Sequence, residues 1–170
     1  MKILVTGSAG FIGFHLIKKL INEGYYIIGL DNINDYYDVN LKYSRLKING
    51  IDINENLNNI ISSSNYKNYR FVKLDLSDHD AVVNLIVNEK FDCVINLAAQ
   101  AGVRYSIENP RIYLKSNIDG FLSILEGCRQ AKVKHLIYAS TSSVYGLNSS
   151  MPLNENMPTE HPRALYAATK

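Results

Sequence analysis

The chain has 170 residues, 46% of them hydrophobic, and a formal net charge of +2 at pH 7. This is enough apolar material for one domain with a buried core, and so small a net charge does not indicate binding to nucleic acid or to a membrane surface. No apolar run approaches the length of a membrane span, so we expect neither a nucleic-acid nor a membrane partner.

Predicted strands and helices alternate in the first part of the chain. A buried strand is predicted over Lys2–Thr6, and nothing before it is typical of a secretory signal peptide. Apolar residues at helical spacing predict a helix over Phe11–Asn22, and Gly24 provides the turn that follows. Two further apolar runs predict strands over Tyr25–Asp31 and Tyr69–Leu74.

The same alternation continues in the second half. A helix is predicted over Asp78–Glu89 and a fourth strand over Asp92–Leu97. A long helix follows over Pro110–Ala131, with the proline near its start, where a missing N–H does no harm. The fifth strand is predicted over Lys134–Ser140, and a final helix begins near Pro162.

This order of elements predicts the fold class. Strands that are apolar throughout and alternate with helices imply an α/β fold, a doubly wound parallel sheet of Rossmann type with helices on both faces. We expect one such domain over residues 1–170. Cys93 and Cys128 lie in a predicted strand and a predicted helix, so we expect buried thiols in a reducing, cytoplasmic compartment rather than a disulfide.

The segment Asn32–Asn68 departs from the alternation because it is long, polar and rich in asparagine. A short helix is predicted over Leu41–Ile48. The second half, Asn49–Asn68, is predicted to be a mobile surface excursion, and an insertion without function is the favoured interpretation of it.

A glycine-rich turn follows the first strand. Gly7, Gly10 and Gly13 stand between that strand and a helix, where backbone N–H groups favour a phosphate and glycine permits close approach of a pyrophosphate. The spacing is a variant of the usual dinucleotide fingerprint, and three glycines alone are also compatible with tight packing. Asp31, at the end of the second strand, strengthens the interpretation, because a carboxylate there accepts hydrogen bonds from ribose hydroxyls. It would repel a ribose 2′-phosphate, so NAD is favoured over NADP; the alternative is an aspartate that only caps a loop.

Hydroxyl-bearing residues mark a candidate catalytic centre. Tyr166 and Lys170 are four apart on the last predicted helix, and therefore on one face of it. The run Ser140–Ser143 follows the fifth strand, at the edge of the sheet where ligands bind in such folds. A neighbouring ammonium favours the phenolate form of a tyrosine, which then accepts a proton from a sugar hydroxyl, with Thr141 or a serine as a relay. A surface-exposed tyrosine and lysine are the alternative.

Taken together, these motifs resemble the extended short-chain dehydrogenase/reductase family. The resemblance covers nearly the whole chain through Thr6–Gly13, Asp31, Asp75-Leu76, Leu97–Gln100, Ala139–Gly146 and Tyr166–Lys170. It implies a catalytic trio of Thr141, Tyr166 and Lys170. The cofactor-binding residues that it and the motifs imply are Gly7, Gly10, Phe11, Ile12, Gly13, Asp31, Asn32, Asn34, Asp75, Leu76, Leu97, Ala98, Ala99, Gln100, Asn117, Tyr166 and Lys170.

Within this family, two short segments of the chain are similar in sequence to UDP-glucuronate 4-epimerases. The similar segments are Asp31–Tyr37 with Leu41-Lys42, and Ala99–Ser106. The related 4,6-dehydratases place Asp-Glu after the catalytic threonine, and the decarboxylases place Ser-Glu there, whereas this chain has Ser142 and Ser143. The substrate-binding residues expected are Arg104, Thr141, Ser142 and Ser143. Arg104 is expected to meet a negative charge of the substrate, with a structural ion pair as the alternative.

The implied reaction oxidises the C4 hydroxyl of a UDP-sugar and re-reduces the 4-keto intermediate on its other face. Alternatives are an epimerase for UDP-glucose or a UDP-N-acetylhexosamine, a sugar-nucleotide decarboxylase or dehydratase, or, from another class, a non-catalytic NAD-binding module. Family members have about twice this length, so we expect a fragment that lacks the C-terminal substrate domain and has little activity alone. The resemblance also implies a homodimer at full length. No metal site is predicted.

Overall fold

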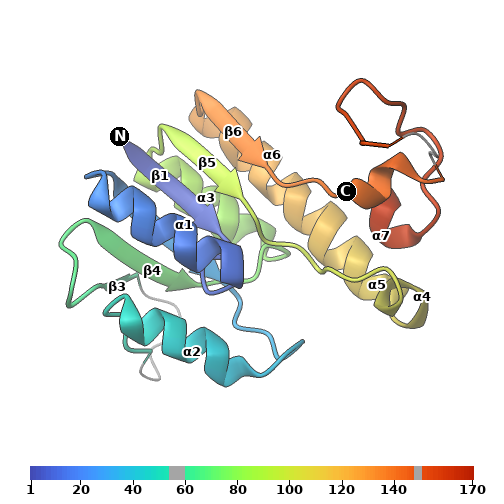
Figure 1. The fold of residues 1–170 in the computed structure, drawn as a ribbon. Helices are drawn as coiled ribbons and strands as arrows, with labels where there is room; N and C mark the ends of the chain where they lie inside the picture. Colours follow the sequence, from blue (N-terminus) through green and yellow to red (C-terminus); the bar gives the residue numbers. More distant parts are fainter. Residues whose placement is uncertain (54–59, 148–150) are drawn as a thin grey trace.

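The parallel core of the structure is built from the apolar runs of the chain, which lie side by side in one twisted sheet (Figure 1). The computed structural model describes residues 1–53, 60–147 and 151–170. In this part of the chain the strand order is β3-β4-β2-β1-β5-β6. The strands are β1 (Lys2–Thr6), β2 (Tyr26–Asp31), β3 (Ile61–Ser62), β4 (Tyr69–Lys73), β5 (Cys93–Asn96) and β6 (His135–Tyr138).

The order of the strands places a crevice beside β1. The chain moves from β1 outward to β2 and β4, then crosses back to pair β5 on the other side of β1, so that Val5 lies between Gly29 and Ile95. Ligands of open α/β sheets bind at such a reversal, outside the carboxyl ends of the strands. The structure therefore brings the turns after β1 and β5 together at one edge of the sheet.

Two pairs of helices cover the two faces of the sheet. One face carries α1 (Phe11–Asn22) and α2 (Val39–Ile48), and the other carries α3 (His79–Glu89) and α6 (Gly120–Ala131) (Figure 1). The expected doubly wound arrangement is confirmed. Among the described residues, no helix is long and apolar enough to cross a membrane.

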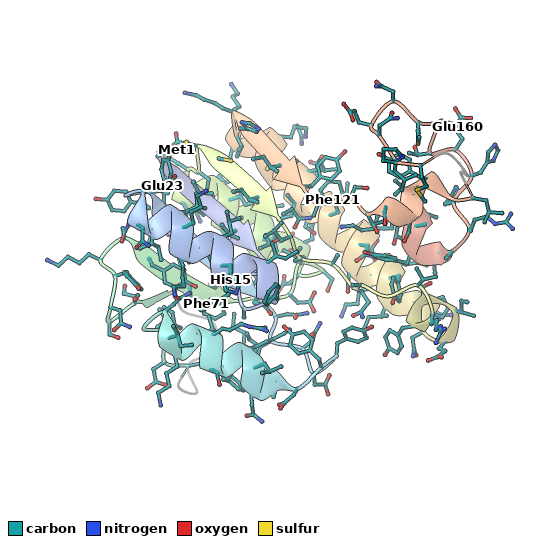
Figure 2. All side chains as sticks on the ribbon, in the orientation of Figure 1. Met1, His15, Glu23, Phe71, Phe121 and Glu160 are labelled. Carbon is teal, nitrogen blue, oxygen red and sulfur yellow. The ribbon has the colours of Figure 1, made fainter. Side chains whose placement is uncertain are left out.

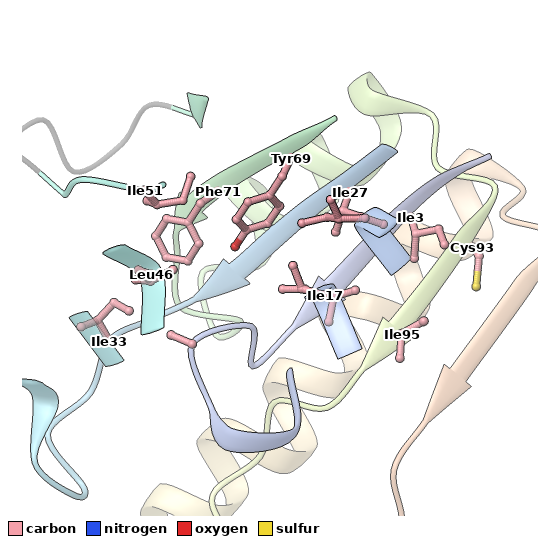
Figure 3. Close-up of a cluster of buried hydrophobic side chains, with 13 residues drawn as sticks. Ile3, Ile17, Ile27, Ile33, Leu46, Ile51, Tyr69, Phe71, Cys93 and Ile95 are labelled. Atoms are coloured by element: carbon pink, nitrogen blue, oxygen red, sulfur yellow. The ribbon is translucent and has the colours of Figure 1, made fainter. Parts of the chain in front are cut away.

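Alternation along the strands separates the core into two clusters. Ile3 and Val5 of β1 point toward α1, where Ile17 is fully buried, whereas Leu4 points to the opposite cluster and packs with Ile86 of α3. Figure 3 shows the first cluster between the sheet and the helices α1 and α2. Because successive strand side chains face opposite sides, an apolar run without interruption fills both layers at once.

The sheet differs from the prediction at one edge. The two-residue strand β3 pairs antiparallel with β4, so the predicted all-parallel sheet is mixed. β3 lies inside Asn49–Asn68, and the prediction of a mobile excursion is wrong for the described parts of that segment. Ile51 is 2% exposed, the Ser63 hydroxyl donates to the Asn49 carbonyl, and the Asn68 amide donates to the Ile21 and Tyr25 carbonyls. Residues 54–59, the middle of the segment, lie outside the described residues.

The predicted long helix Pro110–Ala131 is not regular throughout. It consists of α5 (Pro110–Tyr113), a π-helical stretch η1 (Leu114–Asp119) and α6, and it follows the short helix α4 (Tyr105–Glu108). A π-helical turn accommodates one more residue than an α-helical turn and often lies at a functional site. Here the irregular stretch carries Asn117, which is buried.

The C-terminal elements are short. A 3-10 turn, η2 (Ser142–Tyr145), follows β6, and the last helix, α7, spans only Leu165–Ala168 rather than beginning near Pro162. The end of β6 contacts the long helix through Phe121, whose ring centroid lies 5.1 Å from that of Tyr138 (Figure 2). Cys93 and Cys128 are buried free thiols, as predicted.

Candidate functional site

The turn after β1 requires glycine at more than one position. Gly7 has φ +66°, and a Cβ atom there would lie 2.9 Å from the Ala98 backbone nitrogen. A Cβ atom at Gly13 would overlap the Gly7 carbonyl oxygen, which accepts a hydrogen bond from the Gly10 amide at 3.0 Å. A side chain at either position would collide with backbone atoms, which cannot rotate away. Glycine therefore allows the turn to pack closely against the backbone that follows β5.

The helix α1 opens directly from this turn. Gly10 is its N-cap, and no side chain caps the helix by a hydrogen bond. The first N–H groups of a helix have no partner within it, and the helix dipole adds partial positive charge at the same end. This end of α1 is therefore suited to an anionic group such as a phosphate.

Asp31 stands beside the glycine turn at the end of β2. Its carboxylate is 5% exposed and accepts hydrogen bonds from the backbone amides of Ala9, at 3.1 Å, and Ile33, at 2.9 Å. The Lys42 ammonium lies 3.3 Å from the same carboxylate and donates to Asn34 at 2.8 Å. The charge is thus held in one orientation at the rim of the crevice.

Asp75 and Leu76 follow β4 and also line the crevice. The Asp75 carboxylate accepts from the backbone and hydroxyl of Ser77, at 2.9 and 2.8 Å, and from the Asn32 amide at 3.2 Å. Partial burial raises the pKa of Asp75, but these hydrogen bonds outweigh that effect and hold the pKa below its ordinary value. The carboxylate therefore stays ionised and locks the loop that follows β4.

These elements enclose one pocket. Its lining residues are Gly7, Gly10, Leu30, Asp31, Asn32, Asn34, Tyr36, Tyr37, Lys42, Leu74, Asp75, Leu76, Leu97, Ala98, Ala99, Gln100, Ala101 and Ser116. Most of the sequence-predicted cofactor residues are in this set. Phe11 and Ile12 are not, because their side chains are 68% and 65% exposed on α1, and Gly13 is buried within the first turn of that helix.

A smaller pocket adjoins the first one, since Ala98 and Ala99 line both. Asn117 lies in its wall and connects three segments: its carbonyl accepts from the Gln100 amide at 2.7 Å, and its amide donates to the Gln100 carbonyl and to the Thr169 hydroxyl. Lys170 also lines this pocket, and partial burial lowers the pKa of its amine. The π-helical stretch thus ties the turn after β5 to the C-terminal helix.

Of the three predicted catalytic residues, Lys170 lines this second pocket, and Tyr166 and Thr141 lie on neighbouring elements. α7 packs against η2, α4 and α5, and the Tyr166 ring lies edge-on to Tyr113 with 6.0 Å between centroids. Thr141 caps η2 by accepting from the Ser143 amide at 3.3 Å. Helical hydrogen bonds continue past α7, from the Thr169 amide to the Leu165 carbonyl at 3.0 Å and from the Lys170 amide to the Ala167 carbonyl at 3.2 Å. That Tyr166 and Lys170 share one helix face stays a prediction.

Arg104 is apart from both pockets. Its side chain is exposed at the start of α4, and within the described residues it forms no ion pair, so the alternative of a structural ion pair is not supported in that part of the chain. Ser142 and Ser143 lie in η2, next to Thr141.

Sequence reasoning missed several residues of the first pocket. The sequence marks Lys42 only as part of the segment Leu41-Lys42 that resembles the epimerases, and nothing in the polar pattern of α2 distinguishes it from the exposed Lys47 on the same helix. Tyr37 contacts two of the three cations of α2, with the Lys42 nitrogen 5.3 Å and the Arg45 guanidinium 5.9 Å from its ring centroid. Lys42 and Arg45 stand four and seven residues after Asp38, the N-cap of α2. Without the fold, this spacing is only weak evidence that either residue lies near the pocket.

The arrangement is suited to a ligand with three parts. The end of α1 takes an anion, Asp31 accepts hydrogen bonds from hydroxyl groups, and Leu76 and Leu97 supply apolar walls for flat rings. The amine of Lys170 lines the adjoining pocket, while the phenol of Tyr166 and the hydroxyl of Thr141 lie on the neighbouring elements α7 and η2, which pack against each other. Such groups serve proton transfer to or from an alcohol.

Comparison with known proteins places this geometry in context. The profile of the family described as GDP-mannose 4,6 dehydratase matches residues 4–170. Protein CapI of Staphylococcus aureus is 52% identical over 170 residues, which are 100% of this chain and 46% of that protein. A probable UDP-glucuronate 4-epimerase of Rhizobium meliloti is 42% identical over 170 residues, again 100% of this chain and 46% of the relative.

A solved structure agrees with the fold. The crystal structure of UDP-glucuronic acid 4-epimerase from Bacillus cereus, in complex with UDP-glucuronic acid and NAD, superposes with a TM-score of 0.82 at 32% identity. The match covers 100% of this chain and 49% of that chain. The chain thus spans about half the length of the curated relatives it matches.

Proposed function

The chain belongs to the family described as GDP-mannose 4,6 dehydratase, and from that premise we propose that it is the NAD-binding part of an enzyme that epimerises UDP-glucuronate at C4 to UDP-galacturonate. The observation that carries the proposal is the first pocket. It joins the glycine turn, Asp31, Asp75-Leu76 and Leu97–Gln100 at the carboxyl ends of the strands, which is where an extended dinucleotide binds in this type of fold.

The residues present fit NAD. Gly7 and Gly13 leave open a cradle that a Cβ atom at either position would disturb, and the uncapped end of α1 supplies N–H groups for a pyrophosphate. Asp31 would hold the adenosine ribose, and Asp75 with Leu76 would flank the adenine. When bound, NAD supplies reversible hydride transfer with the sugar carbon.

Three residues of the chain would move or hold the proton of the substrate hydroxyl. Tyr166 would accept it at the phenol oxygen and return it after the sugar has turned over. Lys170, whose pKa is lowered by burial, would stabilise the phenolate, and Thr141 would hydrogen-bond the same hydroxyl. Asn117 would position these groups through its hydrogen bond to Thr169.

One feature supports epimerisation over elimination of water, and another supports the choice of substrate. Ser142 and Ser143 follow Thr141, so η2 has no acid and base pair of the kind that dehydration needs. The epimerases among the relatives and solved structures, named for UDP-glucuronate or UDP-glucuronic acid, support the choice of substrate. Exposed Arg104 is the proposed contact for the negative charge of the substrate.

We expect the protein expressed from its complete reading frame to interconvert UDP-glucuronate and UDP-galacturonate. Since the relatives are about twice as long, the assay uses the complete protein. It offers UDP-glucuronate, UDP-glucose and UDP-N-acetylglucosamine separately and resolves the products by anion-exchange chromatography. Turnover of either neutral sugar with none of UDP-glucuronate would overturn the proposed substrate, and binding of NAD without any turnover would favour the non-catalytic module.

A homodimer is proposed on the outer face of the long helix. Leu114, Ile118, Leu122 and Leu125 recur at helical spacing and are 41–52% exposed, while the opposite face of α6 packs against α3. An apolar stripe of this kind on a helix is typical of a helix–helix interface. Leu122→Glu is expected to convert a dimer of the complete protein to a monomer in light scattering. The control Gln130→Glu, exposed on the same helix outside this stripe, is expected to leave the dimer intact. An unchanged mass of Leu122→Glu would contradict the interface.

A further inference from the structure

A buried cation lies in the part of the pocket that we assign to the adenosine ribose. Lys42 is 5% exposed, and its ammonium donates to the Asn34 carbonyl oxygen at 2.8 Å and to Asp31 at 3.3 Å. Burying a lysine is costly unless its charge is paired. The pairing with Asp31 therefore accounts for the burial and places the positive charge in the wall of the pocket.

The carboxylate of Asp31 does not depend on Lys42 for its hydrogen bonds. The amides of Ala9 and Ile33 already donate to it, one to each oxygen. An ammonium has three N–H groups, and within the described residues that of Lys42 donates to two oxygens. The third N–H is thus left for a ligand in the pocket that Lys42 lines.

The helix α2 brings a second cation to the same corner. The Arg45 guanidinium donates to the Ala9 carbonyl and to the Tyr37 hydroxyl, each at 3.1 Å. Asp75 also lines the pocket, where Ser77 and Asn32 hold it. Lys42 therefore contacts Asp31 directly, while Arg45 contacts Ala9, whose amide donates to Asp31.

We propose that Lys42 is a specificity-determining residue for the ribose end of the dinucleotide: it offsets the charge of Asp31, so that a ribose 2′-phosphate is rejected less strongly than Asp31 alone would reject it. This rests on the proposed function, since it concerns the same pocket. Asp31 favours a ribose with free hydroxyls over one with a 2′-phosphate, and Lys42 reduces this preference. Cofactor choice follows from the pair rather than from the carboxylate alone.

The test measures the ratio of the two dissociation constants, Kd for NADP over Kd for NAD, by calorimetry on the nucleotide-free complete protein. Lys42→Met keeps the approximate length of the side chain but removes the charge. We expect the ratio to rise about tenfold, because a charge removed within a few ångströms of a phosphate in a partly buried site has an effect of this order. Lys42→Arg keeps the charge and is expected to leave the ratio within about threefold of the wild type.

The matched control is Lys47→Met, which removes an exposed lysine from the same helix and is expected to leave the ratio unchanged. Each ratio is taken on one preparation, so a variant that is partly unfolded still reports it. A ratio for Lys42→Met within twofold of the wild type, or an equal rise in Lys47→Met, would overturn the role of Lys42 while NAD binding by the wild type upholds the proposed function. Failure of the wild type to bind either dinucleotide would overturn both.

Discussion

Replacement of Tyr166 by phenylalanine is expected to lower kcat for C4 epimerisation by about 10²- to 10⁴-fold, the usual range for loss of a general acid–base group. The phenol oxygen is the proposed acceptor of the substrate proton, and phenylalanine has no atom that takes its place. The ring itself remains, so its edge-on packing against Tyr113 is retained. We therefore expect the fold and the Kd for NAD to stay within about twofold of the wild type, measured by circular dichroism and calorimetry beside the initial rates.

Tyr43→Phe is the control for this substitution. Tyr43 is 41% exposed on α2 and is absent from the lining of the pockets beside the proposed chemistry, so loss of its hydroxyl is expected to leave kcat unchanged. If Tyr166→Phe kept kcat within tenfold of the wild type, the proton would be handled by another group, and the role assigned to Tyr166 would be wrong.

Gly13→Ala is expected to weaken NAD binding by at least about 100-fold and to lower the free energy of unfolding by about 3 kcal/mol, as overpacking at a rigid site does. The added Cβ atom meets the Gly7 carbonyl, which is backbone and cannot rotate away. Relief of this overlap moves the glycine turn, and the N–H groups at the start of α1 move with it. Urea unfolding gives the stability change, and titration with NAD gives the affinity.

Gly24→Ala separates this effect from the general cost of replacing a glycine. Gly24 has φ +83° in the turn after α1, and no atom lies within 4 Å of a Cβ atom built there. We expect a loss of about 1 kcal/mol from the left-handed backbone and no change in the Kd for NAD. NAD binding by Gly13→Ala within threefold of the wild type would show that the tight turn is not required for the cofactor.

The elements β1, α1 and the end of β2 were predictable from the sequence, because the patterns that indicate them are local. The bounds of β1 and α1 agree with the prediction, since an apolar run, a glycine turn and a helical repeat follow each other within 22 residues. The end of β2 at Asp31 was predictable for the same reason. Each of these features is decided by neighbours in the sequence, and burial then reinforces it.

The edge of the sheet was not predictable in this way. β3 is two residues long, and within the described residues the strand that it pairs with is β4, several residues further along the chain. The apolar residues that anchor the Asn-rich segment, such as Ile51, are too few for a periodic pattern. The π-helical stretch was not predictable either, because one extra residue in a turn leaves the apolar spacing of α5 and α6 nearly intact.

The sequence by itself determined which chemical groups follow the strands: the glycines after β1, the carboxylate after β2, the Asp75-Leu76 pair after β4 and the hydroxyls after β6. Only the tertiary structure decided which of them share a pocket. Lys42 meets Asp31 because α2 packs back on the end of β2. Asn117 meets Thr169 across 52 positions because the reversal of strand order beside β1 gathers the carboxyl ends of the strands at one edge. Contacts of that kind depend on how whole elements pack, and no local pattern of residues encodes them.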